Sequence, residues 1–150
     1  WQARFVGDET LDPKWASELR DKVALSGLST QIEFVGTVAN IASEYQNADI
    51  FVLPSKFEGY GMVLSEAMAH GLPIISTRTG AIPEVVPESA GILVKSEDHS
   101  ALAAALKKLI LDGDLRNKMQ LSAQKAASTL PTWRACAELI LKGMEIITKR

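Results

Sequence analysis

Short apolar runs alternate along the chain with longer stretches in which apolar residues recur at helical spacing. The runs predict strands at residues 3–7, 32–35, 49–53, 72–76 and 91–94. Helical patterns lie at about residues 13–25, 39–47 and 61–70, and from about 98 onward with breaks near 113 and 131 and a last amphipathic stretch at 132–148. Strands and helices are therefore expected to follow one another in turn.

This alternation predicts the fold class. Strands joined to helices by short loops form a parallel sheet with helices on both faces, which is a doubly wound α/β architecture. Residues 49–53 are almost wholly apolar, as a strand covered on both faces must be, so we expect them at the centre of the sheet. A length of 150 residues favours one domain, residues 1–150. Ligands of such sheets bind beyond the carboxyl ends of the strands, which points to the loops after Gly7, Gly36, Leu53 and Ser76.

The segment predicted to form the first helix contains signals for where the helix starts and for which of its faces is buried. Asp12 suits the N-cap and Pro13 the first helical position. The apolar stripe predicted to face the core consists of Trp15, Leu19, Val23 and Leu25.

Composition and charge exclude several classes of function. Hydrophobic residues make up 47% of the chain and charged residues 23%, as in an ordinary soluble globular protein. The formal net charge of −2 provides no positive field, so no nucleic-acid partner is expected, and membrane contact is not indicated. No apolar run reaches the roughly 18–20 residues that span a bilayer. The single cysteine, Cys136, agrees with a reducing compartment and a cytoplasmic location.

The segment with the most chemistry leads from an apolar strand at residue 53 into a helix near residue 61. Gly59 and Gly61 permit close approach of the backbone to a ligand, and the free amides of the first helical turn form a site for an anion such as phosphate. Glu58 lies at the mouth of this cradle, whereas Glu66 lies roughly 7–8 Å along the helix axis. Each carboxylate can accept hydrogen bonds from sugar hydroxyls, so the pattern favours a diphosphate with a sugar at each end.

A structural interpretation is available for each of these residues taken alone. Residues 59–61 also suit a tight strand-to-helix turn, Glu58 a solvated loop and Glu66 an ordinary helix surface. It is the combination that favours a binding site.

The combination also resembles a known pattern. Glu58 and Glu66 are separated by seven residues, within a segment similar to the E-x7-E signature of retaining glycosyltransferases with two Rossmann-like domains, especially family 4. Further matching segments are Phe5-Val6-Gly7-Asp8, Phe34-Val35-Gly36-x-Val38, Ala48-Asp49-Ile50-Phe51-Val52-Leu53-Pro54-Ser55, Glu66-Ala67-Met68-Ala69-x-Gly71-x-Pro73, Thr79-Gly80-Ala81-Ile82-Pro83-Glu84 and Gly91-Ile92-Leu93-Val94.

The resemblance implies a function and a role for each matched position. It implies a Rossmann-like carboxy-terminal half of a GT-B fold that binds a nucleotide-sugar donor, for transfer with retention of anomeric configuration. No spacing of acidic residues and histidines suggests a metal site, and no cofactor is expected. Glu58 matches the position that contacts the transferred sugar and is the expected catalytic residue. Glu66 matches the position that holds the ribose hydroxyls. The expected donor-binding residues are Gly36, Val38, Gly59, Tyr60, Gly61, Met62, Val63 and Glu66.

Two parts of the family pattern are not found in these 150 residues. The family usually carries an Arg and a Lys, after the first strand of this domain, that neutralise the diphosphate, and that strand would precede Trp1. The amino-terminal acceptor-binding domain is the second missing part. We therefore expect a piece of a longer enzyme that is inactive alone.

Two alternatives remain open at this point. A nucleotide-sugar-binding module without catalysis and a sugar-nucleotide epimerase suit the same fold.

Asp112-Gly113-Asp114 has the D-x-D form that holds a metal in another class of glycosyltransferases. Because it separates two helical patterns, we interpret it as a structural turn in which Gly113 ends one helix and Asp114 caps the next. The base, sugar, acceptor and oligomeric state are left open.

Overall fold

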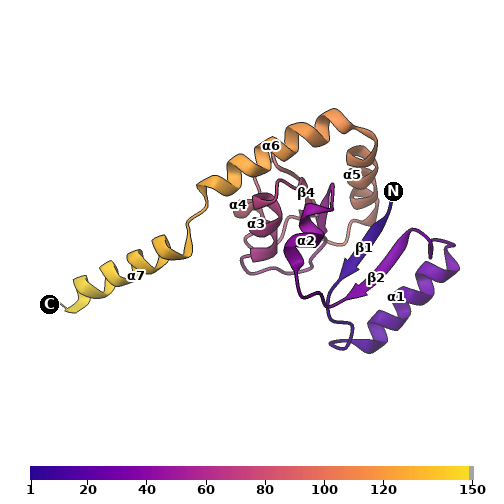
Figure 1. The fold of residues 1–150 in the computed structure, drawn as a ribbon, viewed down its shortest axis with the longest axis horizontal. Helices are drawn as coiled ribbons and strands as arrows, with labels where there is room; N and C mark the ends of the chain where they lie inside the picture. Colours follow the sequence, from indigo (N-terminus) through magenta and orange to yellow (C-terminus); the bar gives the residue numbers. More distant parts are fainter. Residues whose placement is uncertain (149–150) are drawn as a thin grey trace. The chain divides into compact units, whose positions relative to one another are not determined.

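The structure, a computed structural model, describes residues 1–148. Strands and helices alternate from β1 to α5, and two more helices follow (Figure 1). The strands are β1 (Ala3–Val6), β2 (Ile32–Gly36), β3 (Phe51–Leu53), β4 (Ile74–Thr77) and β5 (Gly91–Val94). The helices are α1 (Pro13–Leu25), α2 (Ile41–Gln46), α3 (Met62–Ala69), α4 (Ile82–Val85), α5 (His99–Leu111), α6 (Gly113–Thr129) and α7 (Trp133–Thr148). Every predicted strand segment overlaps an observed strand, although β2 and β4 each extend one residue beyond the predicted end.

The strand pairings are all parallel, which confirms the α/β class. β1 pairs with β2, while β3, β4 and β5 form a second sheet in that order. The expectation that residues 49–53 form the centre was wrong, because β4 lies between its two partners in this sheet. All four residues of β4 are buried. Since side chains alternate across a strand, β4 is covered on both faces.

The chain divides into two compact units, Trp1–Gln46 and the part that begins at Asn47. In the amino-terminal unit, the rings of Phe5 and Phe34 stack across β1 and β2 with centroids 5.2 Å apart. Arg4 on β1 forms ion pairs with Glu33 on β2 and with Glu44 on α2. These contacts join the two strands and α2 within this unit.

Helix α1 begins as predicted but buries less than predicted. Asp12 is the N-cap, and its carboxylate accepts a hydrogen bond from the Trp15 amide at 3.0 Å. No residue of α1 is fully buried, and Trp15 and Leu25 are 52% and 89% exposed. The expected buried stripe was therefore wrong at these two positions. Two paired strands offer this unit too little apolar surface to cover the whole helix face.

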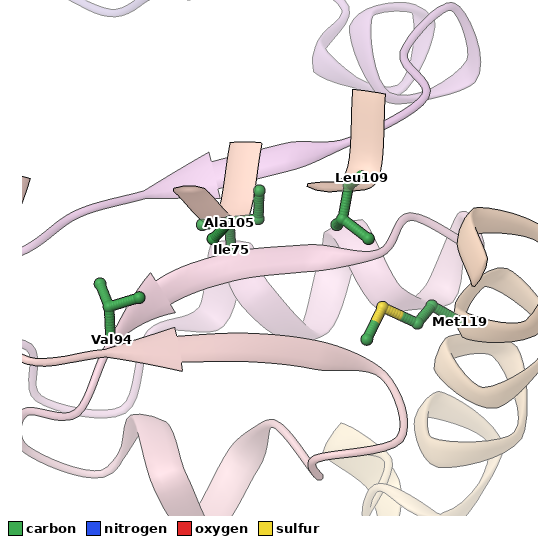
Figure 2. Packing of buried hydrophobic residues seen from close by; sticks show 5 residues of the cluster. All are labelled: Ile75, Val94, Ala105, Leu109 and Met119. Carbon is green, nitrogen blue, oxygen red and sulfur yellow. The ribbon is translucent and has the colours of Figure 1, made fainter. Parts of the chain in front are cut away.

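The core of the second unit forms around β4. Figure 2 shows Ile75 of β4 beneath Ala105 and Leu109 of α5, with Val94 of β5 and Met119 of α6 beside them. The core is continued elsewhere in this unit by buried residues of α3 and α4, namely Leu64, Ala67, Met68, Ile82 and Val85.

The D-x-D segment is the junction of α5 and α6, but its cap differs from the prediction. The carboxylate of Asp112 accepts a hydrogen bond from the Leu115 amide at 2.9 Å, so Asp112 is the N-cap. Gly113 is the first residue of α6, and Asp114 lies in its first turn, where a negative charge is favourable. Among the described helices, none combines the length and the apolar character needed to cross a bilayer.

The core predicts a sharp difference between two leucines of α5. Leu109 is fully buried in the cluster around β4, whereas Leu111 is 72% exposed at the end of the same helix. We expect Leu109→Ala to lower the free energy of unfolding by about 2–5 kcal/mol, through lost burial and a residual cavity. The control Leu111→Ala is expected to stay within about 0.5 kcal/mol of the parent. Urea unfolding followed by circular dichroism measures both, and equal effects would contradict this core.

Candidate functional site

The candidate site lies at the carboxyl ends of β3, β4 and β5. These strands are parallel and adjacent, so the segments that follow them leave the sheet at the same edge. The first of these segments, residues 54–61, is the loop that carries the first glutamate of the E-x7-E pattern. We call it the Glu58 loop.

Three hydroxyl side chains, in β4 and just after it, hold the end of β3 and the start of the Glu58 loop. Ser76 donates to the carbonyl of Leu53, the last residue of β3, at 2.6 Å, while Thr77 donates to Ser55 at 2.6 Å and Thr79 to Lys56 at 3.0 Å. The bonds from Thr77 and Thr79 extend the β3–β4 pairing beyond the last backbone pair, Leu53 with Ser76. We call Ser76, Thr77 and Thr79 the hydroxyl series.

Sequence reasoning missed the hydroxyl series. Ser76 and Thr77 are buried polar residues, and a buried hydroxyl needs a hydrogen-bond partner. Small hydroxyl residues at the end of an otherwise apolar strand were the available signal. Their partners lie 22 or 23 residues earlier in the chain, so the sequence could show the donors but not the acceptors.

Glu58 is half-buried in this loop. Its carboxylate lies near the Ser55 hydroxyl, with 3.5 Å between Oγ and Oε2, a distance at the limit of hydrogen bonding. The next residue is fixed through its backbone, because the Ala81 amide donates to the Gly59 carbonyl at 3.3 Å. The segment after β4 therefore contacts the Glu58 loop both at its start and at Gly59, the residue that follows the glutamate.

Gly61 forms the transition from the loop to α3. It is the N-cap residue, with φ of 74° and ψ of 54°, in the left-handed region that favours glycine. A β-carbon at Gly61 would lie 2.8 Å from Leu64 Cδ1 and 3.2 Å from Glu58 Cγ. Sequence reasoning assigned this glycine to ligand approach, and the structure adds that α3 needs it in order to start where it does.

Helix α3 presents the second half of the expected donor site. The amides of Met62 and Val63 lie in its first turn, where an α-helix offers no internal acceptor. Glu66 lies further along the same helix and is exposed. The structure therefore brings Glu58, the glycines and Glu66 together as one continuous loop and helix start.

The remaining expected residues belong to the amino-terminal unit. Gly36 ends β2 with φ of 74°, and its carbonyl accepts a hydrogen bond from the Gly7 amide at 3.0 Å. Val38 follows in the next loop and is half-buried. The loops after β1 and β2 are thus joined within their own unit.

An ion pair connects the Glu58 loop with the loop after β5. Lys56 Nζ lies 2.7 Å from Glu97 Oε1, and both side chains are exposed. The hydrogen bond to Glu97 raises the pKa of Lys56, and the same bond lowers the pKa of Glu97. Glu97 has a φ of 65°, an uncommon conformation for a residue other than glycine. Within the part of the chain that the structure describes, no three His, Cys, Asp or Glu side chains gather as metal ligands.

Comparison of the sequence with known proteins identifies a matching family and a similar protein. The family described as glycosyl transferases group 1 matches residues 1–112. The lipopolysaccharide core biosynthesis mannosyltransferase LpsB of Rhizobium meliloti (strain 1021) is 40% identical over 110 residues, which cover 70% of this chain and 31% of that protein. The chain therefore spans less than a third of the length of this relative.

Two solved structures match over most of the chain. The carboxy-terminal domain of a glycosyl transferase group 1 family protein, LpcC of Francisella tularensis, aligns with a TM-score of 0.75 and 28% identity, covering 85% of this chain and 83% of that one. HepE of Anabaena in complex with UDP aligns with a TM-score of 0.87 and 25% identity, covering 96% of this chain and 40% of that one. The fold thus matches both an isolated domain and part of a longer protein.

The hydroxyl series predicts a specific loss of stability. Thr77→Val keeps the side-chain shape but removes the donor to the Ser55 carbonyl, so we expect the free energy of unfolding to fall by about 1–3 kcal/mol. Thr30→Val, at an exposed turn, serves as the control and is expected to stay within about 0.5 kcal/mol of the parent. Urea titrations of the two variants measure the difference. Equal stabilities would show that the Thr77 bond does not hold the loop.

Proposed function

Because the chain belongs to the group 1 glycosyltransferases and corresponds to their carboxy-terminal domain, we propose that it holds the donor in a retaining sugar transfer. The donor is a nucleoside-diphosphate sugar. The observation that supports this most strongly is the Glu58 loop, which is held by the hydroxyl series and runs through Gly61 into the open first turn of α3.

We assign each part of this segment to one part of the donor. The amides of Gly59, Gly61 and the first turn of α3 bind the diphosphate, since a helix start provides free N–H groups and a favourable dipole. Glu58 accepts hydrogen bonds from the transferred sugar, and Glu66 accepts them from the ribose. This order follows the chain from the loop into the helix.

The remaining expected positions complete the assignment. Tyr60 is half exposed between the two glycines, and its backbone joins the diphosphate site. Gly36 and Val38 are proposed to contact the base, which rests on the family pattern of their turn. UDP is the first nucleotide to test, because HepE was solved with UDP.

The protein's part in the reaction is electrostatic and positional. The bond between the anomeric carbon and the diphosphate oxygen breaks, and its electron pair leaves with the diphosphate. An acceptor hydroxyl forms the new bond on the same face of the sugar, and its proton passes to the leaving diphosphate. Fixed amides at the helix start stabilise the charge that develops on the leaving group, where such donors contribute most to rate. No metal, cofactor or protein nucleophile enters this proposal.

The 150 residues alone are expected to bind the donor but to transfer no sugar. The family pattern places the acceptor site, and the basic pair that neutralises the diphosphate, in parts that this sequence does not contain. The measurement is transfer of radiolabelled sugar to lipid, saccharide or water by the purified chain. Robust transfer to an added acceptor would contradict the assigned division of labour.

Donor binding tests the function, and two glutamate variants test its geometry. A thermal-shift screen of UDP-, GDP- and ADP-sugars identifies the base, since a ligand at 100 times its Kd stabilises by about 2.7 kcal/mol. Glu66→Gln is expected to weaken the bare nucleotide and the nucleotide sugar alike, whereas Glu58→Gln weakens only the sugar-bearing ligand. Each sensitive affinity should fall about ten- to a hundredfold, because a hydrogen bond to a charged group contributes roughly 1.5–3 kcal/mol.

A matched control separates these effects from a change of charge. Glu18→Gln removes an exposed carboxylate from α1 and is expected to leave both affinities unchanged. Calorimetry of UDP and UDP-glucose with the three variants gives the comparison. If Glu58→Gln and Glu66→Gln both bind as the parent does, the E-x7-E assignment is wrong in this protein.

A further inference from the structure

Gly80 lies against the backbone of the Glu58 loop more closely than any side chain would permit. A β-carbon built on Gly80 would lie 1.7 Å from the Glu58 carbonyl oxygen and 2.8 Å from its carbonyl carbon. Neither atom belongs to a flexible side chain, so a substitution must displace the Glu58 peptide or the residue 80 backbone. The two residues are therefore in direct backbone contact.

The conformation of Gly80 adds a second requirement. Its φ of 53° lies in the left-handed region, which residues with a β-carbon rarely adopt. Gly27 shows a similar φ of 71°, but a β-carbon there meets nothing within 4 Å. A comparison of substitutions at Gly80 and Gly27 thus separates the cost of the left-handed conformation from the cost of the contact with Glu58.

The residues on either side of Gly80 bind the same loop. Thr79 donates its hydroxyl to the Lys56 carbonyl at 3.0 Å, and the Ala81 amide donates to the Gly59 carbonyl at 3.3 Å. The segment 79–81 thus contacts the Glu58 loop at Lys56, two residues before Glu58, at Glu58 itself and at Gly59. Loops are usually more mobile than the elements they connect, and these contacts fix the position of one peptide within this loop.

We propose that Gly80 is a positioning residue that fixes the Glu58 peptide and thereby sets the preference of the site for a sugar-bearing nucleotide over the bare nucleotide. The second half of this inference rests on the proposed role of Glu58 toward the sugar. Gly80 itself acts through the Glu58 backbone. Because Glu66 lies on α3, beyond Gly61, its contact with a ribose does not depend on this position.

Nuclear magnetic resonance of the 150-residue chain tests the contact without any ligand. In Gly80→Ala, the amide signals of Glu58 and Gly59 are expected to shift far beyond their line widths, although these residues lie more than 20 positions away in sequence. Gly27→Ala is the control, with a comparable conformational penalty and no change at Glu58 or Gly59. Unshifted Glu58 and Gly59 signals in a folded Gly80→Ala would overturn the proposal.

Ligand binding tests the consequence. We expect Gly80→Ala to reduce the affinity for UDP-glucose about tenfold or more while UDP affinity changes less than twofold, as for loss of a hydrogen bond to a charged group. The effect should be absent when Glu58→Gln is already present, since both substitutions disable the same contact. Additive losses in the double variant would show that Gly80 does not act through Glu58.

A second pair of variants covers a failure of Gly80→Ala to fold. Thr79→Val removes the donor to the Lys56 carbonyl, whereas Thr79→Ser retains it, so only the former should shift the Glu58 amide and weaken UDP-glucose. Identical behaviour of this pair would count against the proposal. If the parent chain binds neither UDP nor any nucleotide sugar, the proposed function fails, while the ligand-free spectra still decide whether Gly80 fixes Glu58.

Discussion

The hydrogen bonds from the hydroxyl series to the carbonyls of Leu53, Ser55 and Lys56 are the constraint on which the candidate site depends. Parallel strands end at the same edge of a sheet, but their backbone pairing stops where the strands stop, here at Leu53 and Ser76. A loop beyond that point needs other partners for its polar groups. Side-chain hydroxyls supply these partners, and they fix the path of the loop where it leaves the sheet.

Two glycines, Gly61 and Gly80, permit the path of the chain from the Glu58 loop into α3. Gly61 turns the chain through a left-handed conformation and leaves room for Leu64, which is fully buried beneath the helix start. Gly80 allows the neighbouring segment to touch the Glu58 peptide. For the proposed diphosphate site, a rigid helix start would let fixed amide donors stabilise developing charge without reorganising during the reaction. Packing under α3 and the proposed binding at its first turn therefore depend on one local geometry.

The same reasoning explains which sequence-based expectations failed. Residues 49–53 were expected at the sheet centre because they are apolar, yet β4 lies between its two partners and all its residues are buried. Asp114 was expected to cap α6, but the carboxylate of Asp112 reaches the Leu115 amide. Trp15 matched a buried helical stripe and is half exposed. Each expectation used periodicity or spacing along the chain, which does not specify which other elements pack against a residue.

The sequence by itself determined the α/β class, the approximate place of each strand, the cap of α1 at Asp12 and the spacing of Glu58 and Glu66. These features depend on residues close together in the chain, where apolar periodicity and local hydrogen bonding decide the outcome. Only the tertiary structure decided that Thr77 and Thr79 bond to the Glu58 loop and that Gly80 touches Glu58. Those contacts join residues more than 20 positions apart, and they exist because β3 and β4 pair in one particular register.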